Sequence, residues 1–117
     1  MINKIIGVIG ANFGDEGKGQ YVNDLIDDEN SKNYFVVRYN GGAQAGHTVY
    51  HNGIRHVFSH FGAGTLKGAN TILTYSFICN PNVFFAERQE LINKGISPIV
   101  YVNDTCKITT PFDVIWN

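Results

Sequence analysis

The chain has 117 residues, of which 44% are hydrophobic and 16% are charged, and its formal net charge is −1. This length allows one small domain, the composition argues against disorder, and a charge near zero leaves no basic footprint for nucleic acid. No apolar run approaches the roughly 20 residues of a membrane span, and the N-terminus lacks a signal-peptide pattern. We therefore expect a soluble cytoplasmic protein without nucleic-acid or membrane partners, in which Cys79 and Cys106 are reduced.

The predicted elements alternate between strands and helices. Residues 5–9 are a short apolar run before a glycine-rich bend, which is typical of a buried parallel strand. The elements that follow are, in chain order, a helix over 17–27, a polar loop over 27–33, a strand over 34–39, a glycine-rich loop over 41–47, a hairpin over 47–58, a strand over 70–75, a helix over 80–95 and a strand over 98–103. This order predicts an α/β fold with a mainly parallel sheet and a β-hairpin insertion.

Turn and cap residues support two of these elements. Asn52-Gly53 lies between two alternating segments, which is the strongest short signal for a hairpin. The helix over 80–95 can begin at a cap on Asn80 or Asn82, and Gly95 suits the position just after its end.

A further helix begins near the C-terminus. Thr110 can cap it, and Pro111 suits its first position. The sequence stops about two turns later, beside the large apolar residue Trp116. We therefore expect residues 1–117 to be the N-terminal segment of a single longer domain.

The sequence GVIGANFGDEGKGQ (7–20) has the features of a phosphate-binding loop. It leaves the carboxyl end of the first predicted strand, where ligands bind in α/β sheets. The helix that follows offers free N–H groups and a positive dipole end to an anion. The glycines let the backbone approach phosphate oxygens, and Lys18 can place its ammonium beside a terminal phosphate. The loop therefore predicts a nucleotide cradle.

The loop differs from a Walker A motif at two positions. The first glycine of that motif falls at Asn12, and its closing hydroxyl, which holds Mg²⁺ in P-loop enzymes, falls at Gly19. Asp15 is the substitute that the sequence offers, because a carboxylate in this loop repels phosphates unless it holds a cation or a proton. The combination of Asp15, Glu16 and Lys18 predicts nucleotide chemistry at a magnesium ion, and it disfavours both a plain glycine turn and a generic P-loop NTPase.

FGDEGKGQ (13–20) together with VVRYNGGAQAGHTV (36–49) resembles two signatures of the adenylosuccinate synthetase family. The usual signatures read Trp-Gly-Asp-Glu-Gly-Lys-Gly-Lys and Arg-hydrophobic-Gln-Gly-Gly-x-Asn-Ala-Gly-His-Thr. The resemblance covers essentially the whole chain in element order, and two independent signatures at the right separation make it specific. Members of this family are several times longer, so the chain is similar to their N-terminal part.

The resemblance implies a ligase of purine nucleotide biosynthesis. Members of the family, usually homodimers, join L-aspartate to inosine monophosphate (IMP) with GTP and Mg²⁺, through a 6-phosphoryl intermediate, and give adenylosuccinate. By this match Asp15 is the general base that takes the proton from N1 of the purine and also binds Mg²⁺. His47 is the general acid at O6, and Lys18 neutralises charge on the transferred phosphoryl group. The Gly46 backbone is expected to offer a carbonyl to Mg²⁺.

The resemblance also implies two overlapping sets of binding residues. Those expected to bind the triphosphate are Gly14, Asp15, Glu16, Gly17, Lys18, Gly19, Gln20, Gly46, His47 and Thr48. Those expected to bind the IMP-like nucleotide are Asp15, Glu16, Gly17, Lys18, Gln44, Ala45, Gly46 and His47. The expected metal ligands are Asp15 and Gly46.

The chain departs from the family signatures at several positions. Phe13 replaces Trp, Gln20 replaces Lys, Asn40 replaces Gln and Gln44 replaces Asn. These departures suggest a divergent branch of the kind that viruses or mobile elements encode, in which some relatives act on guanine nucleotides and make 2-aminoadenylosuccinate. That branch has Ser where this chain has Asp15. The carboxylate therefore favours IMP as the acceptor, with GMP or its deoxy form as the alternative.

The choice between GTP and ATP stays open, because the family's guanine-recognition segment would lie beyond residue 117. Its aspartate-binding loop would lie there too, so the fragment alone is expected to be inactive and to need the rest of the enzyme. A non-catalytic module that binds a nucleotide or a partner chain is the remaining alternative. A carboxylate that faces phosphate, at Asp15, favours chemistry over simple binding.

Other polar residues are expected to have structural roles. His51, His56 and His60 lie on strand-like segments without a carboxylate partner at metal-ligand spacing, so we expect surface or packing histidines. Arg38, at the end of a strand, either steers phosphate or forms a structural ion pair.

Overall fold

The structure is a computed structural model that describes residues 4–11 and 17–116 and, of residues 114–116, the backbone only. The strands are β1 (Phe35–Arg38), β2 (His47–His51), β3 (Ile54–Phe58), β4 (Asn70–Leu73), β5 (Ile78–Cys79), β6 (Val100–Val102) and β7 (Lys107–Ile108). The helices are α1 (Lys18–Leu25), α2 (Pro81–Asn93) and α3 (Pro111–Trp116), with short 3₁₀ helices η1 (Ser31–Asn33) and η2 (Thr65–Lys67).

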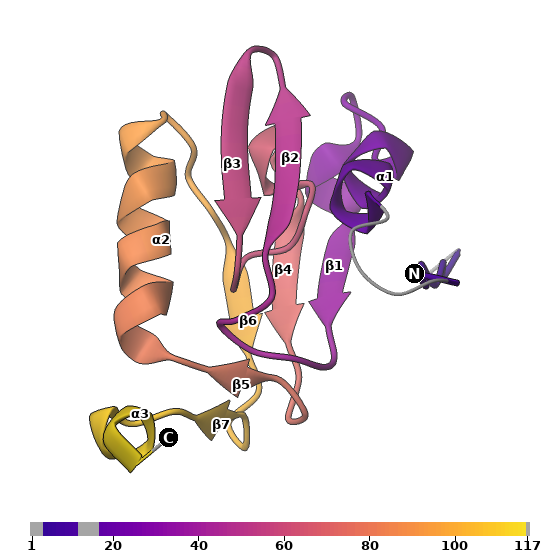
Figure 1. Cartoon of the computed structure of the whole chain (residues 1–117). Coiled ribbons are helices and arrows are strands. Elements are labelled where there is room, and N and C mark those ends of the chain that lie inside the picture. The colour runs from indigo at the N-terminus through magenta and orange to yellow at the C-terminus, as the bar shows by residue number, and fades with distance from the viewer. Residues whose placement is uncertain (1–3, 12–16, 117) are drawn as a thin grey trace.

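Three parallel strands form the main sheet, in the order β1-β4-β6. The antiparallel hairpin β2-β3 crosses in front of this sheet, α2 runs alongside it, and α1 lies next to β2 (Figure 1). A small parallel pair of strands, β5-β7, lies near one end of the sheet, and α2 begins directly after β5 (Figure 1). Within residues 4–11 and 17–116, no helix combines the length and hydropathy of a bilayer-crossing segment.

The predicted alternation is confirmed by β1, β4, α2 and β6, and the predicted hairpin by β2 and β3. Asn52 and Gly53 form its turn with φ angles of 49° and 76°, as a type I′ turn requires. The cap of α2 is Asn80, whose side chain accepts hydrogen bonds from the N–H groups of Asn82 and Val83 at 3.1 and 3.3 Å. The local turn and cap chemistry therefore sets these elements as the sequence indicates.

The predicted strand over residues 5–9 is wrong. Residues 4–10 have no regular secondary structure, and Ile5 and Ile9 are 86% and 82% exposed. An apolar run indicates that a segment tends to be buried, but a parallel strand also needs a neighbouring strand with which to pair. Among the described residues, no strand pairs with the outer edge of β1. The sequence also gives no sign of β5 and β7, because two-residue strands carry no periodicity.

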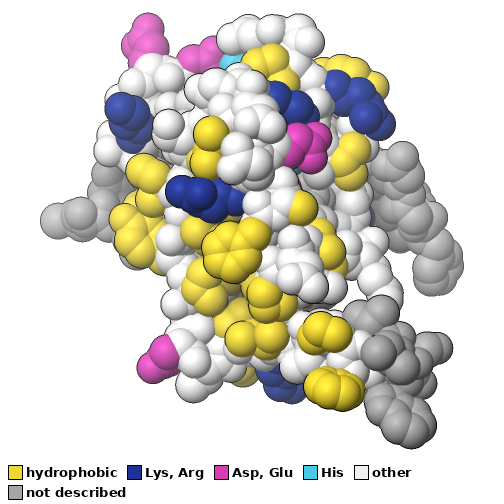
Figure 2. All heavy atoms as spheres, turned by 90° about the vertical axis from the view of Figure 1, so that its left-hand side faces the viewer, with side chains coloured by type: hydrophobic (Ala, Val, Ile, Leu, Met, Phe, Trp, Pro, Cys, Tyr) yellow, Lys and Arg dark blue, Asp and Glu magenta, His cyan; other side chains and the backbone are white. Residues whose placement is uncertain are grey.

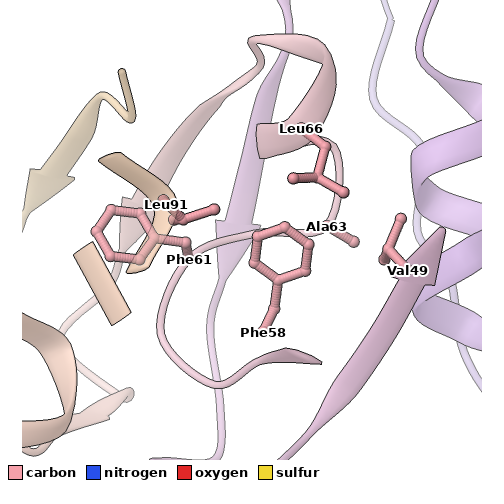
Figure 3. Packing of buried hydrophobic residues seen from close by; sticks show 6 residues of the cluster. All are labelled: Val49, Phe58, Phe61, Ala63, Leu66 and Leu91. Atoms are coloured by element: carbon pink, nitrogen blue, oxygen red, sulfur yellow. The ribbon is translucent and has the colours of Figure 1, made fainter. Parts of the chain in front are cut away.

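The hydrophobic core lies between the sheet, the hairpin and α2 (Figure 3). Phe58 from the end of β3 and Phe61 from the following turn are fully buried at its centre. Phe61 also stacks on Phe84 of α2, with ring centroids 5.0 Å apart. The core residues shown in Figure 3 are Val49, Phe58, Phe61, Ala63, Leu66 and Leu91. Burial of these side chains attaches the hairpin to α2.

Glu87 of α2 is buried beneath the turn that follows β3. Its carboxylate accepts hydrogen bonds from the N–H groups of Ser59, His60 and Phe61 at 2.8–3.4 Å, and from Ser59 Oγ at 2.7 Å. The imidazole of His56 lies 3.3 Å from the same carboxylate. Burial raises the pKa of Glu87, but the hydrogen bonds from His56, His60 and Ser59 outweigh burial, and the pKa lies below its ordinary value.

Hydrogen bonds also define the tautomers of two buried histidines. The N–H of Asn80 donates to His60 Nε2 at 2.9 Å, so a neutral His60 carries its proton on Nδ1 and donates it to Ser59 Oγ at 3.0 Å. Lys94 Nζ donates to His56 Nδ1 at 2.9 Å, which leaves the Nε2–H of His56 for Glu87. Burial lowers the pKa of His60, which favours this neutral form. Both histidines therefore serve packing in a hydrogen-bonded network.

Replacing Glu87 with Ala should lower the free energy of unfolding by about 3 kcal/mol or more, because three buried backbone N–H groups and His56 lose their acceptor. The pKa of the Glu87 carboxyl is lower in the folded than in the unfolded state, so the ionised carboxylate stabilises the fold. This contribution is fully present above the ordinary pKa of 4.5, and it is lost as the pH falls through the lower pKa of the folded state. Urea unfolding at neutral and acidic pH measures both effects. Glu29→Ala, in an exposed loop, is the control, and equal stability of the two variants would contradict this account.

Candidate functional site

The candidate site lies where the first turn of α1 meets the start of β2. Gly19 is buried against His47, and a Cβ added to Gly19 would lie only 2.7 Å from the Cβ of His47. Real Cβ atoms essentially never approach so closely, so only glycine permits this contact. As a result Lys18, the first residue of α1, and His47, the first residue of β2, lie in neighbouring positions.

This contact gives a physical reason for the departure from the Walker A motif. The closing hydroxyl of that motif falls at Gly19, and a Ser or Thr side chain there would collide with the Cβ of His47. The helix can approach β2 only by leaving this hydroxyl out. Any metal ion that bound here with a phosphate ligand would therefore need an oxygen ligand from another residue.

The N-terminus of α1 has the properties of an anion site. Its N-cap is Gly17, with a φ of 74°, and no side chain among the described residues caps it. The first turn holds no acidic side chain, so the positive end of the helix dipole is not neutralised within α1, and Lys18 adds a cation. An open cavity of about 310 Å³ adjoins this end and is lined by Gly7, Val8, Ile9, Lys18 and Tyr21.

His47 lies in a positively charged environment. Burial lowers the pKa of its imidazole, and the charges of Arg38 and Lys18 lower that pKa further. The ring is therefore neutral at neutral pH, and a neutral imidazole still donates one N–H. Such a group can hydrogen-bond an oxygen on which negative charge develops.

Arg38 is held by the core rather than presented to solvent. Its guanidinium lies 5.0 Å from the centroid of the Phe77 ring, and Nη1 donates to the carbonyl of Phe61 at 3.4 Å. Burial lowers the pKa of Arg38, and the charge of Glu87 opposes that shift. These contacts are structural, but neither is the ion pair that the sequence left open, and the charge of Arg38 acts on His47.

The second glycine-rich loop is attached to β5 and contains an internal turn. Gly42 forms a parallel bridge with Ile78 of β5, and the N–H of Ala45 donates to the carbonyl of Gly42 at 3.1 Å. Gln44 and Gly46 are exposed between this turn and the start of β2. Gly46 thus has a backbone carbonyl next to His47, and such an oxygen is the kind of ligand that Mg²⁺ prefers.

Only part of the expected site can be placed. The structure puts Gly17, Lys18 and Gly19 next to the strand that begins with His47 and Thr48. The expected residues outside the described part of the chain are Gly14, Asp15 and Glu16. Within the described part, no group of three or more His, Cys, Asp or Glu side chains could hold a metal ion.

Gln20 makes a contact that sequence reasoning missed. Its side-chain amide exchanges two hydrogen bonds with the backbone of Tyr50, and it also donates to Asp24. The hairpin register could have indicated that the backbone of Tyr50 is free for such a contact, but nothing in the sequence indicates that α1 lies against it.

These features define the class of the chain: an α/β protein in which two glycine-rich segments place a lysine and a histidine beside the N-terminus of a helix. The adenylosuccinate synthetase family model matches residues 7–117. The chain therefore belongs to the adenylosuccinate synthetase family, and the predicted resemblance and fold class are confirmed.

Individual relatives show the same similarity. The chain is 36% identical over 110 residues to the adenylosuccinate synthetase of Borrelia duttonii, covering 94% of this chain and 25% of that protein. It is 37% identical over 107 residues to that of Deinococcus radiodurans, covering 91% and 25%. The solved structure of fully ligated adenylosuccinate synthetase from Plasmodium falciparum matches with a TM-score of 0.66 and 27% identity, over 85% of this chain and 22% of that one. The chain thus spans about a quarter of the length of the curated relatives it matches.

Replacing Gly19 with Ala tests the contact between α1 and β2. In a free helix this change would stabilise by about 1 kcal/mol. Because the new methyl group would collide with His47, we expect it to lower the free energy of unfolding instead, by about 1–3 kcal/mol. Gly7→Ala is the matched control, since an added Cβ there meets nothing within 4 Å. Denaturant unfolding compares the two, and a stabilised Gly19→Ala variant would rule the contact out.

Proposed function

We propose that this chain is the phosphate-handling part of an adenylosuccinate synthetase. The proposed reaction joins L-aspartate to IMP with GTP or ATP, through a 6-phosphoryl intermediate, and gives adenylosuccinate in purine nucleotide synthesis. The single observation that carries the proposal is the close contact of Gly19 with His47, because it puts a lysine and a histidine beside one helix N-terminus. Family membership supports the same reaction.

Each residue of the site has a proposed role. Lys18 and the N–H groups of α1 neutralise charge on the phosphoryl group as it moves to O6 of the purine. His47 donates its N–H to O6, and its position beside two cations favours the developing negative charge there. Asp15 takes the proton from N1 of the purine. The base and the acid then act on two atoms of the same ring.

Mg²⁺ is the proposed metal, and the residues present fit it. Asp15 supplies a carboxylate and Gly46 a backbone carbonyl, which are the hard oxygen ligands that Mg²⁺ takes. Gly19 lacks the hydroxyl ligand of a Walker A loop, and the carboxylate of Asp15 is proposed to take its place. When bound, the ion would neutralise charge on the triphosphate.

Two further proposals concern the nucleotide-binding residues and the acceptor. We propose that Gln44, Ala45 and Gly46 line the IMP-like nucleotide and that Thr48 lines the triphosphate. Asp15 favours IMP over GMP or its deoxy form as the acceptor, because the 2-aminoadenylosuccinate branch has Ser at that position. The alternative from another class, a nucleotide-binding module without catalysis, would gain nothing from this carboxylate.

The proposed partner of this chain is the remaining part of the same enzyme fold. Among the described residues, Phe35, Val37 and Tyr101 lie on one face of the main sheet and are each about half exposed, and the rings of Phe35 and Tyr101 are 6.1 Å apart. Figure 2 shows further hydrophobic side chains gathered over the side that carries α2. Exposed apolar surface of this kind favours docking to more polypeptide. We expect the assembled enzyme to be a cytoplasmic homodimer, as is usual in the family.

A chimera tests the proposed chemistry. Residues 1–117 of this chain would replace the matched quarter of the Deinococcus radiodurans enzyme, and phosphate release would be measured with GTP, Mg²⁺, aspartate and IMP. We expect Asp15→Ala, Lys18→Ala and His47→Ala each to lower kcat/KM by about 100-fold or more, because each removes a group that acts in the transition state.

Lys32→Ala serves as the control, since Lys32 is an exposed lysine of η1. Full turnover by Asp15→Ala would overturn the assigned mechanism. Phosphate release with dGMP but not with IMP would establish the alternative acceptor. Binding of GTP without any release of phosphate would establish the non-catalytic module.

A further inference from the structure

The side chain of Gln20 forms a two-way hydrogen-bond pair with the backbone of Tyr50. The N–H of Tyr50 donates to Gln20 Oε1 at 2.8 Å, and Gln20 Nε2 donates to the carbonyl of Tyr50 at 3.2 Å. Gln20 Nε2 also donates to Asp24 Oδ1 at 3.0 Å, one turn further along α1. The amide is therefore fixed between α1 and β2, with both of its polar ends engaged.

The hairpin register explains why Tyr50 is available for this pair. The two-residue turn makes His51 and Ile54 the first pair of the ladder, so Tyr50 and Arg55 form the next, non-hydrogen-bonded pair. The N–H and the carbonyl of Tyr50 consequently point away from β3, toward the outer edge of the hairpin. The side chain of Gln20 occupies this edge as the peptide group of another strand would.

We infer that Gln20 is a positioning residue that fixes Lys18 relative to His47. Its pair with Tyr50 attaches α1 to β2 at a second point, next to the contact of Gly19 with His47. Val22 also packs α1 against the core, and the Gln20 pair adds a directional contact at the end of the helix that carries Lys18. This inference rests on the proposed function, in which Lys18 and His47 act on one phosphoryl group. The side-chain amide of Gln20 is engaged in this pair, so the expected triphosphate contact would have to come from its backbone N–H.

The inference is specific to an amide at this position. Lysine, the usual family residue here, has three donors and no acceptor, so it would leave the N–H of Tyr50 without a partner. Glutamate has the acceptor but lacks the donor for the carbonyl of Tyr50. Of lysine, glutamate and glutamine, only glutamine supplies both, and its amide reproduces the donor and acceptor of a peptide group.

NMR on the 117-residue chain tests this inference without any nucleotide. In Gln20→Met, which keeps the shape but loses both hydrogen bonds, we expect the amide of Tyr50 to exchange with solvent about five-fold faster, and the ring signals of His47 to shift. Gln20→Lys should behave like Gln20→Met, and Gln20→Glu should restore part of the protection of Tyr50. Gln89→Met is the matched control, because among residues 4–11 and 17–116 the side chain of Gln89 bonds only Asn93, one turn along its helix, at 2.9 Å.

Unchanged exchange at Tyr50 in Gln20→Met would overturn the inference. Faster exchange at Tyr50 with unmoved ring signals of His47 would also overturn it, because the pair would then hold the strand edge without positioning the site. An equal shift of the His47 signals in Gln89→Met would overturn the inference too, because the shift would then not depend on the Gln20 pair. Failure of the chimera assay concerns the proposed function, whereas these signals report on the Gln20 pair alone.

Discussion

The structure of this site depends on how closely α1 approaches the start of β2. With a side chain at position 19 the helix would have to move away from His47, and Lys18 would move with it. The absence of a Cβ therefore sets the separation of the two groups proposed to act on the phosphate. Burial and the two neighbouring cations then keep the imidazole of His47 neutral. This contact sets the local geometry and brings Lys18 close, while Arg38, held by Phe77 and Phe61, supplies the second charge.

Much of the fold could be predicted because short-range chemistry determines it. The turn at Asn52-Gly53 and the cap at Asn80 are local devices whose residues identify them directly. The strand predicted over residues 5–9 failed because an apolar pattern does not specify which edge a strand will pair with. The buried network around Glu87 was also missed, since its other members lie 26–31 residues from Glu87 in sequence and its donors are mainly backbone N–H groups.

The candidate site was partly predictable for the same reason. Lys18 and His47 were identified by motifs, and the departure at Gly19 was visible as an anomaly in a phosphate loop. Its cause was not visible, because the collision involves a residue 28 positions later in another element. Gln20 shows a different limit: the signature assigned it to the ligand, but did not indicate that its side-chain amide is engaged by the strand beside it.

The most direct test of the central claim is a crystal structure of the chimera with Mg²⁺, a non-hydrolysable GTP analogue and IMP. This account predicts that Lys18 Nζ contacts the terminal phosphate and that the ring of His47 lies between this phosphate and O6 of the purine, with Gly19 still against His47. A terminal phosphate bound away from the N-terminus of α1, with the ring of His47 turned from O6, would contradict it.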